Sequence, residues 1–86
     1  MDNILAIKLG LIERIKSRRK EARLSQSVLA NRTGVSLGSI KRLENKGEIS
    51  LSALFKIAVV LGYEDDFNQL FARKNFQSLD EIIDAK

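Results

Sequence analysis

Residues 25–45 read SQSVLANRTGVSLGSIKRLEN, and this stretch predicts two short helices that meet at Gly34. Ser25 is suited to cap the first helix, because its hydroxyl can accept a hydrogen bond from a free backbone N–H of the first turn. Ser36 can cap the second helix in the same way. Gly34 can adopt the left-handed conformation that ends a helix and turns the chain sharply. The stretch is therefore a helix-turn-helix pattern, although a plain helical hairpin without function has the same local signals.

The segments on either side extend this pair into an all-α fold, a compact bundle of about five helices. Ile12 and Ile15 recur at helical spacing in a first helix over about 9–22, and Arg19 and Ala22 continue their buried line. Ile4, Leu5 and Ile7 can either extend this helix through Gly10 or form a separate lead-in. We place the start near Gly10, because glycine costs about 1 kcal/mol inside a helix. A fourth helix follows Ser50 and ends at Gly62, with one side made by Leu51, Leu54, Phe55, Ala58 and Leu61.

The C-terminal third predicts a fifth helix and a tail. The acidic run over 64–66 favours a helix start, since acids are stabilising at the positive end of the helix dipole. Phe67, Leu70 and Phe71 give this helix a buried face, and the capping-box pattern over 78–81 opens a last short turn. We expect a single domain over 1–86, with a helical bundle over 9–71, the helix-turn-helix over 26–45 and a tail over 72–86 that can form a short helix.

Composition excludes several classes of function. The 86 residues contain no cysteine, which excludes disulfides and thiolate metal sites, and no histidine, the commonest general base. The acidic run over 64–66 is explained better as the start of a helix than as a metal site. We expect no enzymatic activity, no cofactor and no metal. No apolar run approaches the ~20 residues that span a bilayer, and the first residues lack a signal-peptide pattern, which predicts a cytoplasmic protein.

The charge is distributed unevenly along the chain. Residues 1–47 carry eleven Lys or Arg against four Asp or Glu, a net +7, whereas residues 48–86 carry four against seven, a net −3. A basic half joined to an acidic half suggests one surface that meets a polyanion. Solvated helix faces of random sign are the alternative.

The predicted helix over 36–45 has two different sides. At 100° per residue, Ile40 and Leu43 point one way with Glu44 beside them. The opposite side is short and cationic, and is made by Gly38, Lys41, Arg42 and Asn45. Such a side suits the major groove of DNA, which is about 12 Å wide and admits one helix.

Residues 14–62 resemble the Cro-type, phage-repressor-like (XRE) helix-turn-helix family. The matching pattern consists of Leu24-Ser25-Gln26, Leu29-Ala30, Gly34-Val35-Ser36, Ile40, Leu43-Glu44-Asn45, Gly47 and Leu61-Gly62. The resemblance implies a lambda-repressor-like fold. It also implies a regulator of transcription that binds a double-stranded DNA operator in a sequence-specific way, and we expect a repressor.

The resemblance also implies roles for individual residues. Gln26 corresponds to a position that holds a DNA phosphate, Leu37 and Gly38 to positions that contact base edges, and Arg42 to a base-contacting position. Lys41 can reach a base or only a phosphate. The full expected DNA-binding set is Gln26, Ser36, Leu37, Gly38, Ser39, Lys41, Arg42, Asn45 and Lys46. For Ser39, Lys41, Arg42, Asn45 and Lys46 a solvated surface residue is the alternative. For Gln26 the alternative is an ordinary polar residue of the first helical turn, and Ser36 caps its helix whether or not DNA is bound.

Two further features concern the first helix and the loop after Gly47. Arg19 lies on the buried line of its helix and so needs a partner, and the family pairs an arginine with a glutamate at the positions of Arg19 and Glu44. We therefore expect a structural ion pair between them.

Glu48 follows Gly47 where relatives often carry basic residues, and it would repel a phosphate.

One short helix reads only a few base pairs, so we expect a homodimer on near-palindromic DNA at the nucleoid. The expected dimer surface is the fifth helix and tail, with Phe67, Leu70, Phe71, Phe76, Leu79, Ile82 and Ile83; alternatively, the tail packs on its own core. A second function stays open, namely an antitoxin of the same fold whose tail or acidic face binds a toxin.

Overall fold

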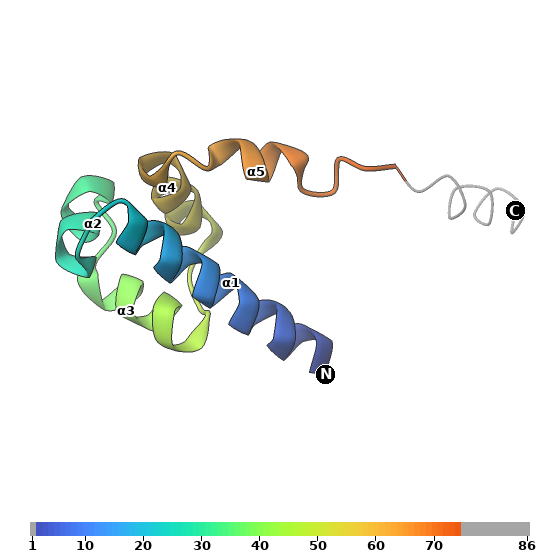
Figure 1. The fold of residues 1–86 in the computed structure, drawn as a ribbon, viewed down its shortest axis with the longest axis horizontal. Coiled ribbons are helices and arrows are strands. Elements are labelled where there is room, and N and C mark those ends of the chain that lie inside the picture. The colour runs from blue at the N-terminus through green and yellow to red at the C-terminus, as the bar shows by residue number, and fades with distance from the viewer. Residues whose placement is uncertain (1, 75–86) are drawn as a thin grey trace, which may run out of the picture.

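The computed structural model describes residues 2–74 and contains five helices there (Figure 1). They are α1 (Asp2–Glu21), α2 (Gln26–Thr33), α3 (Leu37–Lys46), α4 (Leu51–Leu61) and α5 (Glu64–Gln69). The described residues form no strand, and the prediction of an all-α bundle of about five helices is confirmed. Phe76, Leu79, Ile82, Ile83 and the capping-box pattern over 78–81 lie outside the described residues.

Three serines begin three of the helices, as predicted. The hydroxyl oxygens of Ser25, Ser36 and Ser50 each accept a hydrogen bond from the backbone N–H three residues later, at 3.1 Å in every case. Gly34 ends α2 in the left-handed conformation, with φ 76°, and its N–H donates to the carbonyl of Ala30. The sharp reversal between α2 and α3 therefore rests on local backbone chemistry.

The core lies where α1, α2, α3 and α4 meet. Leu29 of α2, Ile40 and Leu43 of α3 and Ile57 of α4 are almost completely buried, and Ile15 of α1 belongs to the same cluster. Figure 1 shows α2, α3 and α4 gathered at one end of α1, whose N-terminal end extends beyond them. Across residues 2–74, none of the helices combines the length and apolar character that crossing a bilayer requires.

The expected start of the first helix is wrong. α1 begins at Asp2 and continues through Gly10, because the helix-forming residues on both sides outweigh the cost of one glycine. The C-terminal end of α3, at Gly47, lies against Lys8 and Ile12 of α1. The apolar residues near the start of α1 are more than half exposed: Ile4, Leu5, Ile7 and Leu9.

The expected buried line of α1 is also too long. Ala22 is exposed rather than buried, because α1 ends at Glu21 and the chain turns away at Arg23, which has φ 60°. Arg19 is therefore the last buried side chain of this helix.

The packed side of α4 differs from the prediction in part. Ala58 is buried and Leu54 and Leu61 are half-buried, but Leu51 and Phe55 are exposed, and Ile57 takes the central buried position instead. α4 is apolar around most of its circumference, so spacing alone did not select the side that contacts α2.

The expected buried face of α5 is largely absent. Phe67 is half-buried and its ring meets that of Phe55 edge-on, with centroids 4.9 Å apart. Leu70 and Phe71 are exposed, Phe71 by 96%, because α5 ends at Gln69 and the chain changes direction before these side chains reach the core.

Candidate nucleic-acid interface

α3 is held in the fold by one side and leaves the other side free. Ile40, Leu43 and Glu44 are buried against the remaining helices, with Glu44 only 2% exposed. The side chains of Lys41, Arg42 and Asn45 are exposed, as is Gly38. The predicted division of this helix into a buried and an open side is confirmed.

The first turn of α3 is organised by two serines. The Ser36 hydroxyl accepts the hydrogen bond from the Ser39 N–H and donates to the Ser39 hydroxyl oxygen at 2.8 Å. Ser39 and Leu37 are half-buried, whereas Ser36 is exposed. These contacts fix the conformation of the N-terminal end of α3.

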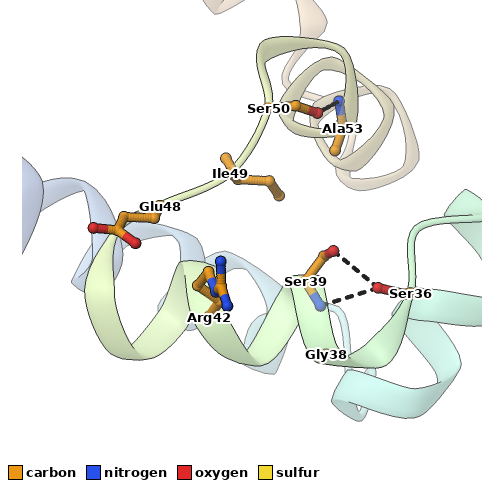
Figure 2. Close-up of a pocket in the computed structure, with 8 residues that line it drawn as sticks. All are labelled: Ser36, Gly38, Ser39, Arg42, Glu48, Ile49, Ser50 and Ala53. Atoms are coloured by element: carbon orange, nitrogen blue, oxygen red, sulfur yellow. Dashed lines mark hydrogen bonds between the residues drawn. The ribbon is translucent and has the colours of Figure 1, made fainter.

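An open hollow of about 540 Å³ lies between α3 and the start of α4 (Figure 2). Gly38 and Arg42 line it from α3, and Glu48, Ile49 and Ser50 line it from the connecting loop. Arg42 projects from α3 toward this loop in Figure 2. The hollow thus combines a cation suited to nucleic acid with one acidic residue that opposes it.

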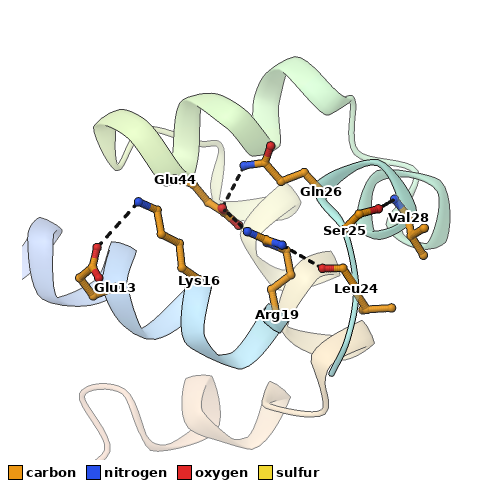
Figure 3. A network of polar contacts seen from close by, with 8 residues as sticks. All are labelled: Glu13, Lys16, Arg19, Leu24, Ser25, Gln26, Val28 and Glu44. Carbon is orange, nitrogen blue, oxygen red and sulfur yellow. Dashed lines mark hydrogen bonds and ion pairs between the residues drawn. The ribbon is translucent and has the colours of Figure 1, made fainter. Parts of the chain in front are cut away.

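Behind the open side of α3, Arg19 and Glu44 join α1 to α3 (Figure 3). Nε of Arg19 donates to Oε2 of Glu44 at 2.7 Å, and Nη2 donates to Oε1 at 2.9 Å. Nη1 of the same arginine donates to the carbonyl oxygen of Leu24 at 2.8 Å. The two parallel bonds satisfy the planar guanidinium and fix the rotation of α3 about its axis.

Gln26 belongs to the same network, which the sequence did not indicate. Its Nε2 donates to Oε1 of Glu44 at 3.0 Å, and its side chain is half-buried at the N-terminal end of α2 (Figure 3). The two residues are 18 positions apart, so no local spacing signals their contact. The contact holds the Gln26 amide in one orientation beside α3.

The network controls the ionisation of Glu44. Burial alone would raise the pKa of this carboxyl, but hydrogen bonds from Arg19 and Gln26, with the charges of Arg19 and Lys16, lower the pKa below its ordinary value of 4.5. The ionised carboxylate is thus favoured in the folded state.

The stability of the protein should therefore depend on pH. Since the folded pKa of Glu44 is below the unfolded one, its contribution is fully present above about pH 4.5 and is lost as the pH falls through the folded pKa. We expect the free energy of unfolding of the wild type to exceed that of Glu44→Gln at pH 7, and the difference to shrink toward pH 3. Urea unfolding along a pH series measures it. Glu13→Gln, on the exposed surface, controls for the loss of one acidic charge. A difference independent of pH would contradict the assignment.

Comparison with known protein families gives a match. A family model described as helix-turn-helix matches residues 15–68, which is more than half of the chain and includes α2, α3 and α4. No curated protein and no solved structure matches. Within residues 2–74, no group of three or more acidic, histidine or cysteine side chains is placed to hold a metal ion.

Proposed function

The chain belongs to the XRE-type helix-turn-helix family of DNA-binding regulators, and from this premise we propose that it is a sequence-specific transcriptional repressor. In this proposal α3 enters the major groove of a double-stranded operator. The observation that carries it is the exposed side of α3, where Gly38, Lys41, Arg42 and Asn45 face away from a well-packed core. We place the protein in the cytoplasm, at the nucleoid.

Each residue of the expected DNA-binding set has a proposed task. Arg42 reads a base, because its fork of donors matches guanine O6 and N7. Lys41 binds a base or a phosphate, and Ser39, Asn45 and Lys46 bind the sugar–phosphate backbone. Leu37 and Gly38 meet base edges. Ser36 caps α3 and lies next to the DNA backbone. The Gln26 amide, which Glu44 holds in one orientation at the start of α2, binds a DNA phosphate.

Selection from random duplexes with the purified full chain tests the proposal. We expect an enriched, near-palindromic motif, and binding to it that weakens steeply with salt, with a slope of about 0.9 per phosphate neutralised. Recovery of no motif, or no binding in dilute buffer, would reject the function.

Replacing Glu48 is expected to strengthen DNA binding, whereas most substitutions at an interface weaken it. It is exposed beside the hollow that Arg42 lines, where an approaching phosphate would be repelled. We expect Glu48→Gln to bind the selected duplex about two- to five-fold more tightly at low salt, corresponding to about 0.4–1 kcal/mol for an exposed charge. Fluorescence anisotropy measures it. Glu13→Gln, on α1, removes the same charge elsewhere and should change the affinity less; equal gains would show a general charge effect.

The repressor would act as a homodimer, with two copies of α3 in successive turns of the groove. Exposed Leu70 and Phe71, after α5, support a contact there, since a side chain 96% exposed gains most from being covered. Light scattering of the chain alone and on the selected duplex tests this. Leu70→Ser with Phe71→Ser should abolish the dimer.

An antitoxin that carries the same DNA-binding helices is the second candidate. The surface near α5 combines Leu70 and Phe71 with the acidic residues of its first turn, a composition that also fits a basic protein partner. A second protein that copurifies with the chain in a fixed ratio, and whose toxicity the chain suppresses, would favour this function.

A further inference from the structure

Gly38 is a glycine that the fold does not require. Gly34, Gly47 and Gly62 end helices with φ between 70° and 86°, a backbone conformation that other residues rarely adopt. Gly38 instead lies inside α3 with no positive φ, and a Cβ added to it would meet nothing within 4 Å in the structure. Glycine inside a helix is destabilising relative to alanine. Neither conformation nor packing therefore explains this residue.

The position of Gly38 suggests where the explanation lies. It is the second residue of α3, is exposed, and borders the same hollow as Arg42 (Figure 2). The N-terminal residues of a recognition helix approach the base edges most closely. Without a side chain at Gly38, the backbone between the Ser36 cap and Lys41 can come directly against another molecule.

We propose, resting on the proposed function, that Gly38 is a specificity-determining residue through the side chain it lacks. The α3 backbone at Gly38 lies in contact with the edge of a base pair, at a separation that excludes even a methyl group. Part of the sequence recognition is then steric, because base pairs differ in the groups that they project into the major groove. The thymine methyl is the bulkiest of these groups, so a backbone in close contact accepts some base pairs and excludes others. In this way a helix with few polar side chains that contact bases can still discriminate between DNA sequences.

Gly10 offers a matched control for this proposal. It too lies inside a helix without positive φ, and a Cβ there would meet only the flexible end of Arg14, with Nη1 at 3.0 Å. Gly10→Ala and Gly38→Ala are therefore the same chemical change in two helices, and both should raise the melting temperature by a few degrees. Only the second change alters the surface of α3.

The test measures binding of the full chain and both variants to the selected duplex by fluorescence anisotropy over a salt series. We expect Gly38→Ala to weaken binding at least tenfold and Gly10→Ala to leave it unchanged. The dependence of the dissociation constant on salt should be the same in all three proteins, because no charge is removed. Gly38→Ser, which is also small, should weaken binding to a similar degree.

The outcomes separate this inference from the function on which it rests. Loss of affinity in Gly38→Ala with a raised melting temperature supports it, as does a different selected motif for that variant. Unchanged affinity and an unchanged motif overturn it while the function stands. A wild-type chain that prefers no sequence rejects the function itself.

Discussion

Replacing Arg19 with methionine is expected to lower the free energy of unfolding by about 3–5 kcal/mol, because it leaves a buried carboxylate without its partner. Glu44 is 2% exposed and receives two hydrogen bonds from Arg19, and the substitution also removes the donor to the Leu24 carbonyl. Typical domains are stable by only about 5–15 kcal/mol, so much of the stability should disappear. Urea unfolding at pH 7 measures the loss.

Two further variants distinguish a buried ion pair from a general effect of losing arginine. The double variant Arg19→Met/Glu44→Leu removes both charges and should recover part of the stability, which gives a large coupling energy in a double-mutant cycle. Arg18→Met, at the neighbouring position, breaks a pair with Glu21 of the same 2.7 Å length whose side chains are 36% and 62% exposed. That loss should be much smaller than the loss in Arg19→Met, because solvent screens an exposed ion pair. A coupling energy near zero between Arg19 and Glu44 would refute the assignment.

Replacing Arg42 with alanine is expected to weaken binding to the selected operator by about 1–3 kcal/mol, or about 5–150-fold. The guanidinium projects from the exposed side of α3 and lines the hollow beside Ser39 and Ser50, so its removal should not disturb the core. Because a base-reading arginine discriminates at one base pair, selection with the variant should return the same motif with one relaxed position. Anisotropy with single-base variants of the operator measures the same effect directly.

Lys46→Ala is the matched control for this experiment. Lys46 is exposed at the other end of α3 and is proposed to contact only the backbone, so its loss should weaken binding to all sequences equally and lower the salt slope by about 1. If Arg42→Ala behaves in that way, Arg42 is a phosphate ligand and the readout belongs to other residues.

The features that local chemistry dictates were predictable from the sequence. Serine caps at Ser25, Ser36 and Ser50 and the left-handed Gly34 depend on a few neighbouring residues, and each was placed correctly. The buried side of α3 was also predictable, because its apolar and charged residues alternate with clear helical spacing. The same pattern placed Glu44 on the inner edge of α3. The buried line of α1 indicated that Arg19 needs a partner, and the family resemblance indicated Glu44 as that partner.

The features that depend on three-dimensional packing were not predictable. α4 is apolar on most sides, so only contact with α2 decides that Ile57 is buried and Leu51 is exposed. The hydrogen bond between Gln26 and Glu44 links two helices at a distance that no sequence period reveals. The extension of α1 through Gly10 reflects the summed preference of a long helix over one unfavourable residue.

The Glu44 carboxylate, on the buried side of α3, ties the orientation of the exposed side, which we propose to face an operator, to the stability of the whole fold. A genetic screen that scores only derepression would consequently return substitutions at Arg19, Gln26 and Glu44 mixed with those at Arg42. Melting curves of the purified variants would distinguish the two groups. Variants at Arg19, Gln26 and Glu44 should have a lowered melting temperature, whereas variants at Arg42 should melt at the same temperature as the wild type.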